Sequence, residues 1–330
     1  MNYFKSFSEK IISGKIHDFD ALALELFHFQ SQNNQIYQRY LQARGVRSAE
    51  VSSLEQIPFL PISFFKTEKV ISQPENECNF SYSSSGTTGM QTSRHFIWSR
   101  EFYLKHSLRL FESVYGSIQD FHVLALLPSY LEREGSSLVD MAAYFIQESG
   151  SEHSGFYLYQ QEDLHKKILH LKKSSKKTLL LGVTFALLDL AERYTFSGFD
   201  NLLVMETGGM KGRRKEMIRE EVHEKLKKAF GLSQIHSEYG MTELLSQAYA
   251  PSDGIFRESF SMRIFIRDTY DPFHWVKGSS GAINVIDLAN FHSCAFLETQ
   301  DLGRKNEDGS FTVLGRMDNS EVRGCNLLIN

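Results

Sequence analysis

Short apolar segments alternate with longer amphipathic segments through the middle of the chain. The apolar segments predict strands at residues 122–127, 155–158, 178–182, 202–206 and 234–239. Between them, apolar residues recur at helical spacing and predict helices at residues 136–148, 162–173, 185–194 and 211–230. Strands that alternate with helices are typical of a mostly parallel sheet with crossover helices. The predicted fold class is therefore α/β, and a ligand is expected beyond the carboxyl ends of the strands.

Three further regions precede this alternating part. Residues 18–45 have a broad apolar stripe and predict a helix that begins at Asp18, a residue type that caps helices well. Residues 57–67 contain two prolines, which exclude a regular helix and predict an extended segment across the surface of a domain. Residues 78–83 and 94–98 predict two strands that are joined by a loop.

The character of the chain changes after residue 245. Four more segments predict strands separated by turns, at residues 263–268, 281–287, 297–304 and 311–318. No predicted helix separates them, so this region is expected to be β-rich. We therefore expect an α/β core at residues 1–245 and a β-rich subdomain at residues 246–330.

Composition excludes several classes of protein. The chain has 330 residues, of which 42% are hydrophobic and 23% are charged, as in an ordinary globular protein. Its net charge of -4 argues against nucleic acid as the main partner. No apolar run is long enough to span a bilayer, and the N-terminus lacks the apolar core of a signal peptide. The three cysteines lack the spacing of a metal site, which favours free thiols and a cytoplasmic location.

The loop between the strands predicted at 78–83 and 94–98 is rich in hydroxyl groups and glycine. It contains Ser83, Ser84, Ser85, Gly86, Thr87, Thr88 and Gly89. Backbone N–H groups in such a loop can form an anion site, and glycine lets the backbone approach a ligand closely. It is not a Walker loop, because Met90 and Gln91 stand where that motif needs Lys and then Ser or Thr. The chemistry favours a phosphate chain as the ligand, and the alternative is a flexible polar turn.

Four signals occur in a particular order along the chain. They are SSSGTTG at 83–89, TGG at 207–209, YGMTE at 239–243, and TQD with LGRMD at 299–301 and 314–318. Their wording and order resemble the motifs of the adenylate-forming enzymes, the superfamily of acyl-CoA synthetases and luciferases. The segments IPFLPISFFKTEKV and RGCNLLIN resemble one branch in particular. That branch is the bacterial acyl-protein synthetases, which supply activated fatty acid to the reductase of bacterial bioluminescence.

The resemblance implies a fold and a reaction in two steps. The fold would be the large N-terminal domain of these enzymes followed by a β-rich part, with the mobile C-terminal domain absent or vestigial. In the first step a carboxylate, with a fatty acid favoured by the resemblance, attacks the α-phosphate of ATP and gives an acyl-adenylate and pyrophosphate. In the second step a thiol takes the acyl group. The thiol would belong to this chain or to a partner such as a reductase or carrier protein.

The resemblance also implies roles for the residues of the four signals. The loop from Ser83 to Gly89 would clasp the β- and γ-phosphates, and Thr242 would contact the α-phosphate. Glu243 would hold Mg²⁺, a hard cation that binds phosphate oxygens together with one or two carboxylates. The nucleoside would be bound by Gly208 and Gly209 close to the adenine, Tyr239 or a neighbour stacked on it, Gly240 in the same turn, Asp301 at the ribose hydroxyls, and Arg316 at the ribose or a phosphate.

Each of these roles has a plainer alternative. Glu243 could be a carboxylate that the dipole of a helix start stabilises. Gly208 and Gly209 could form an ordinary turn from a strand to a helix. Asp301 could be a turn residue that precedes Gly303.

Cys325 is the predicted acyl carrier. The resemblance implies a cysteine near the C-terminus that holds the acyl group as a thioester, and Arg323 beside Cys325 would favour the nucleophilic thiolate. The alternative is an ordinary buried cysteine. The lysine that these enzymes carry in their C-terminal domain has no counterpart in the hinge-like segment 315–324. Lys66 and Lys211 are candidates for its role by position alone.

Two other functions stay open at this point. A CoA ligase of the phenylacetate type would make the same adenylate and pass the acyl group to free CoA. A non-catalytic subunit would bind a nucleotide within a larger acyl-transfer complex. The two differ in one observable, because only the ligase releases pyrophosphate when an acid is supplied.

Overall fold

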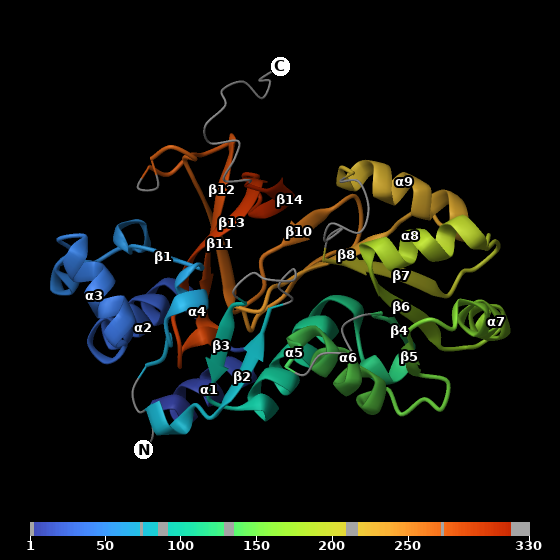
Figure 1. Cartoon of the computed structure of the whole chain (residues 1–330), viewed down its shortest axis with the longest axis horizontal. Coiled ribbons are helices and arrows are strands. Elements are labelled where there is room, and N and C mark those ends of the chain that lie inside the picture. Colours follow the sequence, from blue (N-terminus) through green and yellow to red (C-terminus); the bar gives the residue numbers. More distant parts are fainter. Residues whose placement is uncertain are drawn as a thin grey trace.

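The backbone is organised around one long twisted sheet (Figure 1). The computed structural model describes residues 3–72, 75–84, 92–128, 135–208, 217–271 and 274–317. Along its main path the sheet contains, in spatial order, β11 (Met262–Arg267), β12 (Ser280–Asp287), β13 (Phe296–Lys305), β14 (Ser310–Arg316), β10 (Ile255–Arg257), β9 (Ala248–Ala250), β8 (His236–Tyr239), β7 (Leu202–Thr207), β6 (Lys177–Val183), β4 (Phe121–Leu126) and β5 (Gly155–Tyr157).

The half of the sheet from β5 to β8 is parallel. Each neighbouring pair in the order β5, β4, β6, β7, β8 runs in the same direction. The connections contain α6 (Ser137–Glu148), α7 (Gln161–Leu171), α8 (Thr184–Arg193) and α9 (Arg219–Phe230). In Figure 1, α5 (Arg100–Tyr115) and α6 lie on one side of these strands, and α8 and α9 lie on the other. Because both faces are covered, β4 is buried along its whole length. The α/β fold predicted from the alternating pattern is confirmed.

The half of the sheet beyond β8 is antiparallel. Each neighbouring pair from β8 through β9, β10, β14, β13 and β12 to β11 runs in opposite directions. This half is the predicted β-rich C-terminal part. The short strand β1 (Leu60–Pro61) adds to it in parallel beside β13. The domain boundary at residues 245 and 246 stays a prediction, and it falls between β8 and β9, which are neighbours in one sheet.

The N-terminal helices pack against the antiparallel half. They are α1 (Tyr3–Ser13), α2 (Phe19–Asn33), α3 (Gln35–Ala43) and the short α4 (Phe64–Thr67). The buried side chain of Gln30 joins α2 to this half, because its Nε2 donates to the Asn290 carbonyl at 2.9 Å and its Oε1 accepts from the Ala295 N–H at 2.9 Å. Among the described residues, no helix is both long and apolar enough to cross a bilayer.

Several short elements complete the fold. β2 (Phe80–Ser83) and β3 (Arg94–Ile97) form a separate antiparallel pair, as the sequence predicts. Single turns of 3₁₀ helix are found at η1 (Ser48–Glu50), η2 (Leu54–Gln56), η3 (Glu75–Glu77), η4 (Ile118–Asp120) and η5 (Leu288–Asn290).

Side-chain caps fix where three of the helices begin. The Asp18 carboxylate accepts from the Ala21 N–H, and the hydroxyls of Ser99 and Ser136 do the same for the N–H groups three residues further on. Each such cap contributes about 1 kcal/mol, because it pairs a backbone donor that the helix itself leaves unpaired. The start predicted at Asp18 is confirmed.

The single helix predicted over residues 18–45 is wrong, because the chain forms two helices that meet at Asn34. Asn34 has an extended backbone and ends α2. Its side-chain oxygen caps α3 by accepting from the Tyr37 N–H at 3.0 Å, and its Nδ2 donates to the Ser293 carbonyl at 2.7 Å. The buried amide therefore stabilises a break that the apolar pattern does not reveal.

Two other boundaries differ from the prediction. α9 begins at Arg219 rather than at residue 211, because Ile218 has an extended backbone; residues 211–216 lie outside the described part of the chain. The segment 57–67 is only partly extended, since it ends in α4. It is also not a surface segment throughout, because Ile57, Phe59 and Leu60 are buried.

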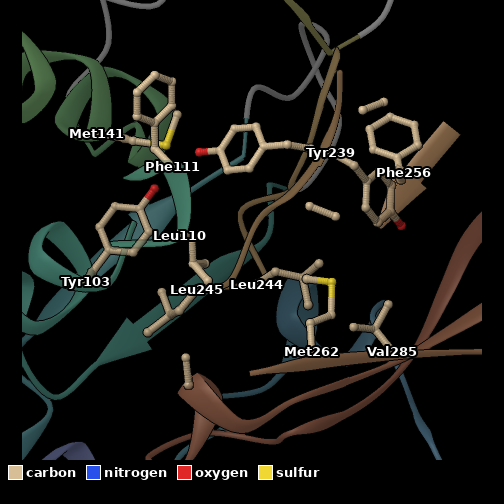
Figure 2. Packing of buried hydrophobic residues seen from close by; sticks show 14 of the residues in the cluster. Tyr103, Leu110, Phe111, Met141, Tyr239, Leu244, Leu245, Phe256, Met262 and Val285 are labelled. Carbon is tan, nitrogen blue, oxygen red and sulfur yellow. The ribbon is translucent and has the colours of Figure 1, made fainter. Parts of the chain in front are cut away.

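The hydrophobic core runs through both halves of the sheet. Figure 2 shows Leu244 and Leu245 in the middle of one part of it, with Phe111 and Met141 toward the α5 and α6 side. Met262 lies on the other side of these leucines, toward the antiparallel strands. The loop that follows β8 is therefore held by core packing on both sides.

Candidate active site

The carboxyl end of β7 carries the first of the predicted nucleotide-binding turns. Gly208 has φ of 71°, in the left-handed region that glycine adopts without strain. The Thr184 hydroxyl at the start of α8 lies 3.2 Å from the Gly208 carbonyl and donates to Glu206 Oε2 at 2.8 Å. Thr184 of α8 thus fixes the position of the turn. Gly209 and Lys211 lie outside the described residues.

Tyr239, Asp301 and Arg316 form a contact group at the end of β8. The Tyr239 hydroxyl donates to Asp301 Oδ2 at 2.8 Å, and Arg316 Nε lies 3.6 Å from Asp301 Oδ1. Burial raises the pKa of Asp301, while the charge of Arg316 and the Tyr239 hydrogen bond act against that rise. The Arg316 side chain is 72% exposed and that of Asp301 only 12%. Tyr239 and Arg316 therefore hold the Asp301 carboxylate in place, where it can accept hydrogen bonds from a ligand.

Glu243 lies in the loop after β8 and is buried. Burial raises the pKa of its carboxyl, and the charge of Asp301 adds to the rise; a hydrogen bond with Ser93 and the charge of Arg316 act in the opposite direction. The Glu243 carbonyl accepts from Asn290 Nδ2 at 2.8 Å, which fixes the backbone of the loop. The Glu243 carboxyl is thus close enough to Asp301 and Arg316 for their charges to affect its pKa.

The hydroxyl-rich loop leaves β2 next to the same place. The Ser84 N–H donates to the Ser93 carbonyl at 3.0 Å, and the Ser93 N–H donates to Ser84 Oγ at 2.9 Å. The Ser83 N–H donates to the carbonyl of Gly135 at 2.8 Å. Both ends of the loop are therefore held. Residues Ser85, Gly86, Thr87, Thr88 and Gly89 lie outside the described part of the chain.

These contacts bring together residues from three of the four sequence signals. Ser84 bonds to Ser93, Ser93 bonds to Glu243, and Glu243 lies within the influence of Asp301 and Arg316. The remaining signal, TGG at 207–209, begins at Thr207. The Thr207 hydroxyl donates to Glu238, the residue before Tyr239. Parallel strands place their carboxyl ends at one edge, which brings Thr207 and Tyr239 together. The β2–β3 hairpin and the antiparallel strands β13 and β14 supply the other residues.

Thr242 is held through its backbone by a buried histidine. His95 Nδ1 lies 2.9 Å from the Thr242 carbonyl, and its Nε2 lies 2.8 Å from Ser293 Oγ. Burial lowers the pKa of His95 to about 4, although the bond to Thr242 opposes this, so the ring is neutral at physiological pH. Phe65 packs edge-on against His95 with ring centroids 5.3 Å apart. The half-buried Lys66 is the next residue of α4.

Two glutamates at the ends of β7 and β8 were missed by sequence reasoning. Glu206 is buried, which disfavours its charge, yet hydrogen bonds from His223 and others together with the Arg219 charge lower its pKa. Burial raises the pKa of Glu238 to about 7, with a further rise from the charge of Glu206. A glutamate inside the strand predicted at 234–239 is the signal that could have revealed Glu238.

The structure describes two of the three cysteines. Cys78 and Cys294 are both buried, and burial raises the pKa of the Cys294 thiol to about 12. A buried cysteine acts as a small apolar residue of the core. Cys325 lies outside the described residues, and its role stays a prediction.

The residues of the site fit a magnesium–nucleotide ligand in their chemistry. Within the described residues no group of three or more His, Cys, Asp and Glu side chains could hold a metal alone. Glu243 is a single buried carboxylate with a raised pKa, so a nearby cation would offset the cost of its charge. Mg²⁺ commonly takes one or two carboxylates and completes its shell with phosphate oxygens and water.

Comparison with solved structures identifies the class of fold. The protein is similar to ATP-bound MatB from Rhodopseudomonas palustris, with a TM-score of 0.53 and 18% identity over 74% of this chain and 50% of that chain. It is also similar to 2-hydroxyisobutyryl-CoA ligase in complex with 2-HIB-AMP and CoA, with a TM-score of 0.66 and 14% identity over 97% of this chain and 70% of that chain. The fold is that of the adenylate-forming enzymes, as predicted.

Comparison of sequences shows similarity to one branch of these enzymes. Residues 9–99 match the family model described as "Acyl-protein synthetase, LuxE". A long-chain-fatty-acid–luciferin-component ligase from Aliivibrio fischeri is 23% identical over 322 residues, which cover 86% of this chain and 78% of that protein. A ligase of the same name from Photorhabdus luminescens is 32% identical over 71 residues, or 22% of this chain and 60% of that protein. The predicted resemblance to acyl-protein synthetases is confirmed, and the names of both relatives agree with the predicted ligase class.

The lengths of the compared proteins differ. The chain spans 50% of the MatB chain and 78% of the A. fischeri ligase.

Proposed function

We propose that the protein is an ATP-dependent ligase that activates a carboxylic acid as an acyl-adenylate and transfers the acyl group to a cysteine thiol. The names of the two relatives support a long-chain fatty acid as the substrate. The resemblance to the acyl-protein synthetases favours a reductase or carrier protein as the acyl-accepting partner. The buried free thiol of Cys294 is compatible with the predicted cytoplasmic location.

The observation that carries the proposal is the path of hydrogen bonds from Ser84 through Ser93 to Glu243, whose carboxyl is also influenced by the charges of Asp301 and Arg316. Segments far apart in the sequence supply hydroxyl groups, a buried carboxylate and an exposed arginine to one edge of the sheet. Adenylation needs such a combination, because both substrates are anionic and their charges must be neutralised while they are held in line.

In the first step a carboxylate oxygen of the acid forms a bond to the α-phosphorus of ATP, and the bond from that phosphorus to the pyrophosphate oxygen breaks. Asp301 would accept hydrogen bonds from the ribose hydroxyls, with Tyr239 fixing its orientation. Arg316 would stabilise charge at the ribose or a phosphate, and Thr242 would contact the α-phosphate. Mg²⁺, held by Glu243 and phosphate oxygens, would neutralise the charge that develops on pyrophosphate.

In the second step a thiolate attacks the acyl carbon, a thioester bond forms, and the bond to AMP breaks. The thiol proton passes to solvent. We propose Cys325 as the thiol that accepts the acyl group, with Arg323 favouring its ionised form. Lys66 and Lys211 are proposed to supply the positive charge that a C-terminal-domain lysine supplies in larger enzymes of this fold.

The similarity to 2-hydroxyisobutyryl-CoA ligase, which extends over 97% of the chain, favours one alternative acceptor. A small thiol such as CoA would take the acyl group from the same adenylate. The two acceptors make different products, so one experiment separates them.

The test is carboxylate-dependent exchange of labelled pyrophosphate into ATP, with acids from acetate to long-chain fatty acids and aryl acids. The same reactions with radiolabelled acid are then examined for hydroxylamine-sensitive label on the protein, in wild type and in Cys325→Ala. We expect exchange with one class of acid, and label that the substitution removes.

The other outcomes discriminate among the alternatives. Exchange without label on the protein would favour CoA or a partner's thiol as the acceptor. Nucleotide binding without exchange for any acid would contradict the enzyme and favour a binding subunit.

A further inference from the structure

A group of polar side chains lies on the face of the sheet that α5 covers, directly below the candidate active site. Glu238 pairs with Thr207 on one side and with Tyr249 on the other, so all three side chains point to this face. Gln247 lies just before β9, and its Cγ and the Glu238 carboxyl both lie beside Gly240. The Phe111 ring of α5 packs edge-on against Tyr249, with centroids 6.0 Å apart.

Two atoms of this group are buried without a hydrogen-bond partner among the residues that the structure describes. They are the Tyr249 hydroxyl and Gln247 Oε1, in side chains that are 3% and 4% exposed. Gln247 Nε2 donates to the Leu245 carbonyl at 3.3 Å, which fixes the direction of the amide. Buried polar atoms are nearly always paired, and one left unpaired requires an explanation. Gln247 and Tyr249 are only two positions apart in the chain. Their two unpaired atoms therefore point to a common ligand.

The group reaches the turn where the substrates are expected to meet. A Cβ atom added to Gly240 would lie 2.5 Å from Glu238 Oε1 and 3.5 Å from Gln247 Cγ. Glu238 and Gln247 therefore lie directly under the Tyr239–Gly240 turn. Farther from the turn the neighbouring side chains are apolar, and Figure 2 shows Leu110, Phe111, Met141 and Leu245 on this side.

The charge state of the group is adjustable. Burial raises the pKa of Glu238 to about 7, while its hydrogen bond from Thr207 opposes the rise and the charge of Glu206 adds to it. The Glu238 carboxyl can therefore either accept a hydrogen bond as a carboxylate or donate one when protonated. Tyr103 also faces it, and its hydroxyl lies 3.1 Å from the Ser137 carbonyl.

We propose that Glu238, Gln247 and Tyr249 bind a hydroxyl or amino group that the carboxylic acid substrate carries close to its carboxylate. This inference rests on the proposed function and narrows its substrate class. Gln247 Oε1 is an acceptor and the Tyr249 hydroxyl can donate or accept, so a hydroxyl or amino group satisfies both. An unsubstituted alkyl chain would leave both atoms unpaired, and sites of this kind discriminate strongly against an analogue that lacks the polar group.

The test compares matched acids in the pyrophosphate exchange assay. Octanoate, 3-hydroxyoctanoate and 3-aminooctanoate are assayed beside butanoate and its 3-hydroxy and 3-amino forms. We expect kcat/KM for one substituted form to exceed that of the unsubstituted acid by about tenfold or more. In Tyr249→Phe we expect this ratio to fall at least about threefold, because one of the partners is lost.

The control is Tyr194→Phe, which makes the same change on a ring that stacks on His165 at the far end of α8. It should leave the ratio at the wild-type value. A second measurement addresses folding. If the Tyr249 hydroxyl is unpaired without substrate, the melting temperature of Tyr249→Phe should equal or exceed that of wild type.

Three results would overturn the inference. Equal or better use of the unsubstituted acids would show that the group serves no substrate, and the proposed function would survive. An unchanged ratio in Tyr249→Phe, or a clearly lowered melting temperature, would show that internal water or the protein already satisfies the hydroxyl. Absence of exchange with every acid would remove the proposed function and this inference together.

Discussion

The Tyr239 hydroxyl donates a hydrogen bond of 2.8 Å to Asp301 Oδ2, although their strands are not neighbours in the sheet. Three strands, β9, β10 and β14, lie between β8 and β13. Phe256 of β10 and Phe311 of β14 pack edge-on against the Tyr239 ring, each with centroids 5.9 Å apart. The sheet therefore curls around this ring, and the bond joins the end of its parallel half to its antiparallel half.

Replacing Tyr239 by Phe should weaken nucleotide binding. Asp301 would keep its charge and lose the donor that orients it, so we expect KM for ATP in the exchange assay to rise about tenfold, the equivalent of about 1.4 kcal/mol. Tyr194→Phe is the matched control. An unchanged KM for ATP in Tyr239→Phe would show that Asp301 does not depend on this bond.

Replacing Glu243 by Gln should affect the chemical step more than binding. The amide keeps the shape of the side chain and removes the negative charge, so we expect kcat for exchange to fall about 100-fold, with a higher Mg²⁺ requirement. Glu224→Gln, on the exposed surface of α9, is the control. If Glu243→Gln exchanged pyrophosphate at the wild-type rate when Mg²⁺ is limiting, that result would contradict a role of Glu243 in metal binding.

Much of this arrangement follows from sequence, and the exceptions have physical reasons. Alternating apolar strands and helices predict the parallel half, because burial on both faces demands that pattern. Tyr239 and Asp301 were each predicted as site residues from the resemblance. Their contact was not, because it depends on how far the sheet curls across three intervening strands, which no local pattern records.

The missed features share one cause. The break between α2 and α3 depends on the Asn34 amide, whose partner Ser293 lies far away in the sequence. Likewise Ser93 gains a role only because Ser84 and Glu243 meet it in space. Long-range hydrogen bonds between polar side chains leave no periodic signal, so resemblance or structure must supply them.

The raised pKa of Glu238 predicts a pH dependence of stability. Its pKa of about 7 lies above the ordinary value of 4.5, so the buried carboxyl binds its proton more tightly in the folded protein. As the pH rises from about 4.5 to about 7, the free energy of unfolding therefore falls progressively, by about 3 kcal/mol at most.

Glu238→Gln removes this titration. We expect its melting temperature relative to wild type to rise from pH 5 to about pH 7 and then to level off toward pH 8. Differential scanning fluorimetry across that range measures the difference, with Glu224→Gln as the exposed control. A difference that stays constant with pH would contradict a raised pKa at Glu238.

Gly208 offers a test of the turn after β7. Gly208 has φ of 71° and Gly45, an exposed glycine far from the site, has φ of 66°. An alanine at either position should cost about 1–2 kcal/mol of stability, because a Cβ atom disfavours this conformation. Only Gly208→Ala should also raise KM for ATP. Equal KM values for ATP in the two variants would indicate that Gly208 is an ordinary turn.

The most direct test of the central claim is detection of the adenylate itself. Purified protein is mixed with ATP, Mg²⁺ and the acid that gives the highest exchange rate, quenched within one turnover, and analysed by mass spectrometry for acyl-AMP. We expect acyl-AMP in amounts comparable to the protein, and a large loss of it in Glu243→Gln. Pyrophosphate exchange without any acyl-AMP, or no acyl-AMP with any acid of the panel, would contradict the assignment of this site to carboxylate adenylation.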